Sequence, residues 1–204
     1  MLIDPFARRI AYLRLSVTDF CNYRCVYCLP DGYQGCGSAD ELSLAEIRTL
    51  VAAFAACGTE KIRLTGGEPT LRADIADIAD IIRICASTPG IQKVALTTNG
   101  HRLAEHYPAL LDAGIDQINL SVDSFRAATF QRLTGKNHLP ALLATIDALL
   151  ARGYHRLKLN ALLMRDSATE LYEDTLAYLK TRPLTMRYIE LMQTGDNAAL
   201  YQRA

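Results

Sequence analysis

The stretch YLRLSVTDFCNYRCVYC, residues 12–28, joins an alternating strand pattern to three closely spaced cysteines. Its first part, Tyr12 to Thr18, alternates polar and apolar side chains, which is typical of a strand with two different faces. Its second part places Cys21, Cys25 and Cys28 at spacings of three and two intervening residues. The stretch therefore predicts a strand that leads directly into a loop of thiol side chains.

More strand patterns recur along the chain, with a helical pattern between each pair. Strands that alternate with helices predict a parallel sheet. The sequence has no low-complexity segment or Pro/Gly-rich linker that would mark a domain boundary. We therefore expect an α/β fold in a single domain over residues 1–204. The further strand patterns are KIRLTGG from Lys61, KVALTTNG from Lys93, QINLSVD from Gln117, RLKLNALLM from Arg156 and MRYIELMQ from Met186.

Polar side chains occupy most positions on one face of each of the first five strand patterns. Parallel strands that are buried on both faces are usually continuous apolar runs, and these are not. The alternation instead predicts an apolar outer face against the helices and a polar inner face around a lumen, as in a partial, open, TIM-like (β/α)6 barrel. For any single strand, a solvated sheet edge or an ion-paired interior is the alternative. Four cations on the expected inner face suit a polyphosphate ligand: Arg14, Lys61, Arg63 and Lys158.

Local signals mark several helix ends. Ser43 with Glu46, and Ser167 with Glu170, have the spacing of a capping box at a helix N-terminus. Glycines follow three of the helical patterns, where a left-handed residue would end the helix. These glycines are Gly58, Gly114 and Gly153.

The composition excludes several classes of partner. Lys plus Arg equals Asp plus Glu at 22 each, so no net field attracts nucleic acid or an anionic membrane. No apolar run reaches about 18 residues, and the charged start MLIDPFARRI is unlike a signal peptide. Six cysteines without a secretory signal favour ligation over disulfides. We expect a cytoplasmic protein.

Three thiols on one loop suggest a specific kind of metal centre. A structural zinc site normally has four protein ligands, and no nearby His or Cys completes this set. Three thiolates can instead hold three irons of a [4Fe–4S] cluster and leave the fourth iron open to another ligand. Cys57 and Cys85 are expected to be small buried hydrophobes near helix ends. The role of Cys36, in a glycine-rich loop, stays open.

Together with the cysteines, four motifs resemble those of the radical S-adenosylmethionine (SAM) enzymes. They are TGGEP at 65–69, TTNG at 97–100, SVDS at 121–124 and ELMQTG at 190–195. Each follows a predicted strand, at the end where barrel enzymes collect their sites. The resemblance implies that SAM binds the open iron. It also implies that the reduced cluster cleaves SAM to a 5′-deoxyadenosyl radical, which takes hydrogen from a substrate.

More narrowly, the chain resembles the GTP 3′,8-cyclases of molybdenum cofactor biosynthesis. The matching runs are DPFARRIAYLRLSVTDFCNYRCVYCLPDG, TEKIRLTGGEPTLR, LTTNG, LSVDS, LKLNALLMRD and RYIELMQTGD. The resemblance implies a lyase that converts GTP to (8S)-3′,8-cyclo-7,8-dihydroguanosine 5′-triphosphate, with Cys21, Cys25 and Cys28 on the cluster. It implies SAM contacts from Tyr27, Gly67, Ser121 and Met192, and GTP contacts from Arg14, Arg63, Thr97 and Lys158. Lys61 joins the GTP set because of its place on the polar strand face.

These cyclases also carry a second three-cysteine [4Fe–4S] cluster and a Gly-Gly tail, and the 204 residues contain neither feature. We therefore expect this chain to bind SAM and GTP but to cleave SAM without efficient cyclisation. Two alternatives stay open: a radical SAM enzyme on another substrate such as a peptide, and a non-catalytic SAM- or nucleotide-binding module. The expected protein partner is an electron donor. Six strands leave sheet edges exposed, and either a second copy in a homodimer or the segment with the second cluster could cover them.

Overall fold

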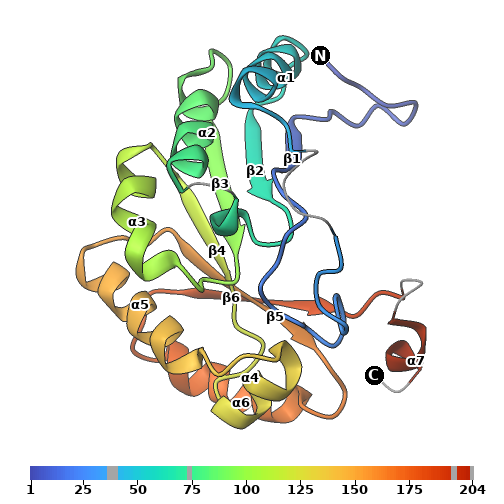
Figure 1. Cartoon of the computed structure of the whole chain (residues 1–204), viewed down its shortest axis with the longest axis vertical. Coiled ribbons are helices and arrows are strands. Elements are labelled where there is room, and N and C mark those ends of the chain that lie inside the picture. Colours follow the sequence, from blue (N-terminus) through green and yellow to red (C-terminus); the bar gives the residue numbers. More distant parts are fainter. Residues whose placement is uncertain (36–40, 73–74, 194–196, 203–204) are drawn as a thin grey trace. The chain divides into compact units, whose positions relative to one another are not determined.

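The computed structural model describes residues 1–35, 41–72, 75–193 and 197–202, so Cys36 lies outside the described residues. Six strands form one open parallel sheet in the order β1-β2-β3-β4-β5-β6, and this confirms the predicted α/β class (Figure 1). The strands are β1 (Tyr12–Ser16), β2 (Lys61–Thr65), β3 (Lys93–Thr98), β4 (Gln117–Ser121), β5 (Leu157–Leu163) and β6 (Thr185–Glu190). The helices are α1 (Leu44–Ala56), η2 (Pro69–Leu71), α2 (Ile75–Ser87), α3 (Leu103–Asp112), α4 (Ala127–Thr134), α5 (Leu139–Ala151), α6 (Ala168–Leu179) and α7 (Ala198–Tyr201).

The chain divides into two compact units. The first unit comprises Met1–Phe20, Gly35–Thr98 and Arg102–Ile118, and the second comprises Cys21–Gln34, Asn99–His101 and Asn119–Ala204. The cysteine loop thus belongs to the second unit although it directly follows β1 of the first. The single domain expected from the sequence stays a prediction.

In the first unit, the apolar face of the strands packs against α1, α2 and α3 (Figure 1). The parallel register pairs Leu15 with Leu64, and Leu64 with Leu96, so these three side chains form one buried row. Burial of such rows is the main stabilising contribution of the unit. The residues that face them from the helices include Ile47, Val51, Ile82, Leu103 and Leu110.

In the second unit, β5 and β6 pair in parallel from Lys158 with Thr185 to Leu163 with Glu190. Helices α4, α5 and α6 supply the apolar core of this unit, together with the buried side chains of β5. Two helices, not one, separate β4 from β5. Buried members of this core include Phe130, Leu142, Ile146, Leu149 and Leu159.

The helix-end predictions have mixed outcomes. The capping box of Ser43 and Glu46 is present at α1, and the three helix-end glycines all have positive φ angles. The second predicted box is wrong, because Ser167 makes no side-chain cap and Glu170 instead contacts Arg126 and Thr129. Of the two outer cysteines, Cys85 is buried as predicted, whereas the prediction for Cys57 is wrong because its side chain is exposed at the C-terminus of α1. No helix among the described residues combines the length and the apolar character that a membrane span requires.

Candidate functional site

The cysteine loop is fastened to the end of α4 by two backbone hydrogen bonds. The N–H of Arg24 donates to the carbonyl of Thr134 at 3.0 Å, and the N–H of Val26 donates to that of Leu133 at 3.0 Å. Next to the first anchor in the sequence, the buried Tyr23 ring packs edge-on against Phe130 with ring centroids 6.4 Å apart. The loop backbone therefore has a fixed course through its first half.

None of the three cysteines on this loop forms a disulfide bond with a described residue; Cys21 and Cys25 are half-buried, and Cys28 is exposed. The N–H groups of Cys28 and Leu29 donate to the carbonyl of Cys25 at 3.0 and 2.9 Å, which closes a tight turn between two of the thiols. Burial raises the pKa of Cys25 to about 12, and the nearby charge of Asp123 adds to this shift. The thiol is therefore protonated at neutral pH, and binding of a metal would release its proton.

The donor set suits an iron–sulfur cluster in its chemistry, since thiolates are the usual ligands of such clusters. Among the residues that the structure describes, however, no three Cys, His, Asp or Glu side chains converge closely enough to hold a metal ion. Cluster assembly would have to draw the three sulfur atoms together. Asn99, which lies at the end of β3, is close to this loop: its Nδ2 donates to Asn22 Oδ1 at 2.9 Å and lies 4.0 Å from Cys21 Sγ.

Tyr27, between the second and third thiols, binds a buried carboxylate. Its hydroxyl donates to Asp123 Oδ2 at 2.6 Å, and Asp123 Oδ1 accepts the N–H of Leu162 on β5 at 2.9 Å. Asp123 is only 3% exposed. Burial raises the pKa of Asp123, and the two hydrogen bonds oppose that shift. Burial, the charge of Asp123 and the bond between them also raise the pKa of Tyr27, so the phenol keeps its proton.

Two of the predicted SAM contacts, Tyr27 and Met192, are linked through Asn197. The Met192 side chain is 76% exposed, so it is not a packing residue. Asn197 Nδ2 donates to the carbonyl of Met192 at 3.0 Å and to the carbonyl of Tyr27 at 3.4 Å. Ser121, the last residue of β4, is half-buried two residues before Asp123. Sequence reasoning missed Asn197, and its only signal there was a polar residue before the short helix α7.

The fourth predicted SAM contact, Gly67, lies in the first unit, in the turn after β2. Its N–H donates to the carbonyl of Thr18 at 2.8 Å, and the N–H of Glu68 donates to the carbonyl of Phe20 at 2.7 Å. A Cβ atom on Gly67 would lie 2.3 Å from the Phe20 oxygen and 2.4 Å from the Asp19 oxygen. The glycine therefore permits close approach, but the approaching group in this structure is the chain's own backbone.

Glu68 completes this turn as a buried carboxylate, 1% exposed. Its Oε1 accepts hydrogen bonds from the N–H of Thr70 at 3.1 Å, from Thr70 Oγ1 at 2.5 Å and from Thr98 Oγ1 at 2.6 Å. Several donors to one carboxylate oxygen offset the cost of its burial. The turn after β2 is thereby tied to the end of β3.

The predicted GTP contacts of the first unit lie on one strand face. The register sets Arg14 directly opposite Arg63, and Arg63 Nη1 donates to Thr97 Oγ1 at 3.4 Å. Lys61 Nζ and Arg63 Cζ lie 5.2 and 5.8 Å from the centroid of the Tyr12 ring, within cation–π range. Arg63 is 8% exposed, whereas Arg14 is exposed and makes no ion pair with any described residue. Three cations and a hydroxyl on one face form a surface that suits an anion.

Lys158, the remaining predicted GTP contact, lies in the second unit on β5. Its side chain is half-buried, and the register places it opposite Thr185 on β6. Within the described ranges its ammonium group forms no ion pair, so it remains available to an anionic ligand.

With this geometry in view, comparison with known proteins decides the family. Residues 15–179 match the model of the Radical SAM superfamily. The chain belongs to this superfamily. The matched range contains the end of β1, the cysteine loop, the glycine turn and strands β2 to β5, so the match extends over parts of both units.

Curated relatives indicate which type of radical SAM enzyme the chain resembles. The chain is 48% identical over 202 residues to a GTP 3′,8-cyclase of Vibrio cholerae serotype O1, and 46% identical over 204 residues to one of Cronobacter sakazakii. These alignments cover 98% and 99% of this chain but only 60% and 61% of the relatives. The chain thus spans about 60% of the length of the curated cyclases that it matches.

Solved structures show the same radical SAM fold at low sequence identity. The [FeFe]-hydrogenase maturase HydG has a TM-score of 0.72 at 19% identity, with 90% of this chain and 43% of that chain covered. The enzyme anSMEcpe with bound AdoMet has a TM-score of 0.70 at 14% identity, with 89% and 51% covered. Likeness at these identities is informative about the fold alone.

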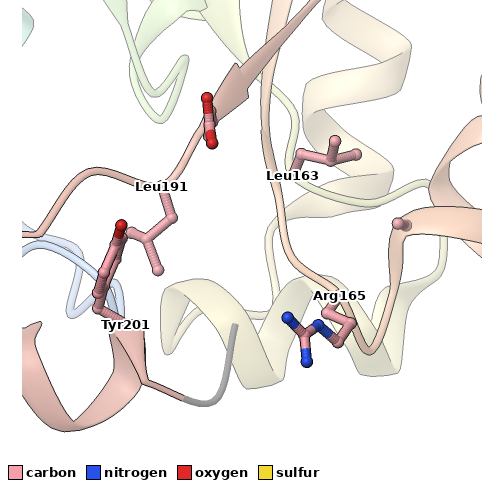
Figure 2. A pocket seen from close by; sticks show the side chains of 6 residues that line it. Leu163, Arg165, Leu191 and Tyr201 are labelled. Carbon is pink, nitrogen blue, oxygen red and sulfur yellow. The ribbon is translucent and has the colours of Figure 1, made fainter.

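A pocket opens in the second unit at the carboxyl ends of β5 and β6 (Figure 2). Leu163 and Arg165 lie on one side of it, and Leu191 and Tyr201 lie on the other. Its volume of about 470 Å³ is within the range of small-molecule sites. Leu191 directly precedes Met192, so this pocket adjoins one of the predicted SAM contacts of the radical SAM core.

Proposed function

We propose that the chain is the radical SAM portion of an enzyme of the GTP 3′,8-cyclase type, a lyase whose substrate is GTP. The observation that carries the proposal is the 46–48% identity to curated cyclases over nearly the whole chain. A radical SAM enzyme that acts on a peptide is the second candidate. The peptide complexes of anSMEcpe share the fold of this chain at 14–15% identity, and that likeness does not favour a peptide over GTP as the substrate.

We assign a [4Fe–4S] cluster to Cys21, Cys25 and Cys28, because they are three thiol side chains on one anchored loop. When bound, such a cluster with SAM supplies the radical that abstracts hydrogen from the substrate. Tyr27, Gly67, Ser121 and Met192 are assigned to SAM on the resemblance. Of these, Tyr27 and Met192 have the strongest support, since Asn197 bonds to both of their carbonyl groups.

We assign GTP contacts to the predicted cations of each unit, on the resemblance and on the strand pattern. Arg14, Lys61 and Arg63 are gathered on β1 and β2, with Thr97 at hydrogen-bond distance from Arg63, and Lys158 is the cation of β5. Guanidinium groups bind phosphate oxygens through paired, charge-assisted hydrogen bonds. A peptide substrate would not explain this number of cations on the predicted inner face. An electron donor protein is the partner that the proposed chemistry requires.

The first test is iron content after anaerobic reconstitution. Cys21→Ala, Cys25→Ala and Cys28→Ala should each abolish the cluster absorbance, because each removes one of three ligands. Cys57→Ala and Cys85→Ala are matched controls elsewhere in the chain and should retain the iron of the parent protein. Normal iron content in Cys25→Ala would contradict the assigned ligand set.

The second test separates GTP from a peptide substrate. Arg63→Ala and Lys158→Ala should weaken GTP binding by roughly 10- to 150-fold, the scale of a hydrogen bond to a charged group. Arg48→Ala on α1 and Lys180→Ala at the end of α6 remove exposed cations and should change GTP affinity by less than about twofold. The measurement is equilibrium dialysis of reconstituted protein, with SAM binding followed in parallel. If both site variants bind GTP with the affinity of the parent protein, Arg63 and Lys158 do not contact GTP and their role is structural.

A further inference from the structure

Tyr27 is held at both of its ends by polar side chains that are nearly inaccessible to solvent. Its hydroxyl donates to Asp123 at 2.6 Å, and its carbonyl accepts from Asn197 at 3.4 Å. Asp123 and Asn197 are 3% and 4% exposed, respectively. Polar groups are costly to bury unless their hydrogen bonds are made, so these two contacts define the position of Tyr27 well.

The hydrogen bonds of Asp123 connect Tyr27 to strand β5 of the sheet. One carboxylate oxygen accepts the Tyr27 hydroxyl, and the other accepts the N–H of Leu162 on β5. Both oxygens thus bond within the protein. The role that this geometry supports is to fix the Tyr27 ring against a strand, which is a rigid element.

The Asn197 side connects Tyr27 to the segment after β6. Asn197 precedes α7, where a side chain of this type often caps the helix, yet it makes no cap hydrogen bond. Its Nδ2 group instead donates to the carbonyls of Tyr27 and Met192. One amide group therefore joins two segments that lie far apart in the sequence.

We infer that Asp123 and Asn197 are positioning residues that hold Tyr27 and Met192 in the arrangement that binds SAM. The inference rests on the proposed function, in which Tyr27 and Met192 contact SAM. It assigns these two residues a role in SAM affinity that is separate from iron binding. The turn between Cys25 and Cys28 is closed by its own backbone bonds, and the loop keeps its two anchors on α4. Iron capacity should therefore survive the loss of either positioning contact.

Three substitutions test this inference with little change of shape. Tyr27→Phe removes the hydroxyl, and Asn197→Asp removes both N–H donors while it keeps the size of the side chain. Each should weaken SAM binding roughly five- to tenfold, the scale of one or two net hydrogen bonds. Asp123→Asn can still accept from Leu162 and can donate to the Tyr27 oxygen, so it should bind SAM within about twofold of the parent protein, whereas Asp123→Ala should not.

The measurements are SAM affinity by equilibrium dialysis, iron per chain, and the melting temperature of the iron-free protein. Thr145→Val is a matched control for Tyr27→Phe, because it removes a buried hydroxyl that bonds within α5 only. The inference predicts weaker SAM binding at parental iron content for Tyr27→Phe and Asn197→Asp, and no change of SAM affinity for Thr145→Val. A change in the electron paramagnetic resonance spectrum on SAM addition should require proportionally more SAM in the two variants.

The outcomes separate this inference from the proposed function. If the parent protein binds no iron or no SAM, the proposed function fails. If the parent binds both, and Tyr27→Phe and Asn197→Asp bind SAM with parental affinity, only the positioning role is overturned. A loss of iron in parallel with SAM in both variants would also overturn it, since the two residues would then support the cluster loop as a whole.

Discussion

The glycine turn after β2 and the cysteine loop after β1 carry two of the superfamily motifs, but their internal order differs. The glycine turn is closed by backbone contacts and by the buried carboxylate of Glu68, whose oxygen accepts three hydrogen bonds. The cysteine loop is anchored at its first half, whereas its thiols do not converge on a metal site among the described residues. The glycine turn is closed by the polypeptide alone, whereas under the proposed function the thiols of the cysteine loop are brought together by iron.

This difference shows that the residues of a sequence motif can be needed for either of two physical reasons. The glycines are required because no side chain fits between two backbone segments, whatever the ligand. Under the proposed function, the cysteines are required by the chemistry of the cluster that they would bind. Substitutions in the two regions should therefore affect different observables: folding stability for the turn, and iron content for the loop.

The largest effect on stability is expected for Gly67→Ala. The added methyl group would meet two backbone oxygens at 2.3 and 2.4 Å, which no side-chain rotation can relieve. We expect a loss of at least about 4 kcal/mol in the free energy of unfolding of the iron-free protein, or no folded protein at all. Gly153→Ala is the control, because its φ of +78° is unfavourable for alanine but nothing lies within 4 Å of the new Cβ. Gly153→Ala should lower the free energy of unfolding by about 1–2 kcal/mol. Equal losses in Gly67→Ala and Gly153→Ala would contradict the explanation that a steric clash destabilises Gly67→Ala.

A smaller effect is expected for Glu68→Gln, which keeps the shape of the side chain and removes its charge. The three hydrogen bonds to Oε1 would become neutral and weaker, with an expected loss of about 1–2 kcal/mol in the free energy of unfolding. Glu105→Gln, at an exposed position of α3, should change stability by less than about 0.5 kcal/mol. Chemical denaturation of the iron-free proteins gives both values. Parental stability in Glu68→Gln would show that the turn does not depend on this carboxylate.

The smallest effect on stability is expected for Cys28→Ala, although it should abolish cluster assembly. The side chain is exposed, so its removal from the iron-free protein should change the free energy of unfolding by less than about 0.5 kcal/mol. Iron content per chain and the denaturation midpoint are measured on the same preparation. A large loss of stability here would mean that the loop is structured by its thiols, and the contrast between the two regions would disappear.

Much of the fold follows from local sequence patterns. Four of the six strands begin at the residue where the alternating pattern begins: Tyr12, Lys61, Lys93 and Gln117. The last two strands are displaced by one residue, at Leu157 and Thr185. Period-two alternation is a local property, and tertiary packing changes only its limits. The register of parallel strands then brings Arg14 and Arg63 to one face, as the pattern predicts.

The parts that the sequence did not predict all depend on long-range contacts. The capping box at Ser167 fails because Glu170 contacts Arg126 and Thr129, which are more than 40 residues away. Asn197 bonds to Tyr27 across 170 residues, and no local pattern marks that pairing. The hydrogen bond between Tyr27 and Asp123 spans 96 residues. Positioning residues of this kind are visible only when the chain is folded.

The assignment of the cysteine loop to the second unit has a consequence for the order of events during protein synthesis. The loop leaves the ribosome early, but its anchors on α4 and its contacts with Asp123 and Asn197 are made much later. At about 5–20 residues per second, the 170 residues between Tyr27 and Asn197 take roughly 9–34 s to translate. Asp123 and the α4 anchors are translated before Asn197, so the contact with Asn197 is the last of the loop's contacts to become possible. Under the proposed function, iron delivery to the native arrangement is therefore an event of late or completed translation, and the three thiols have to stay reduced until then.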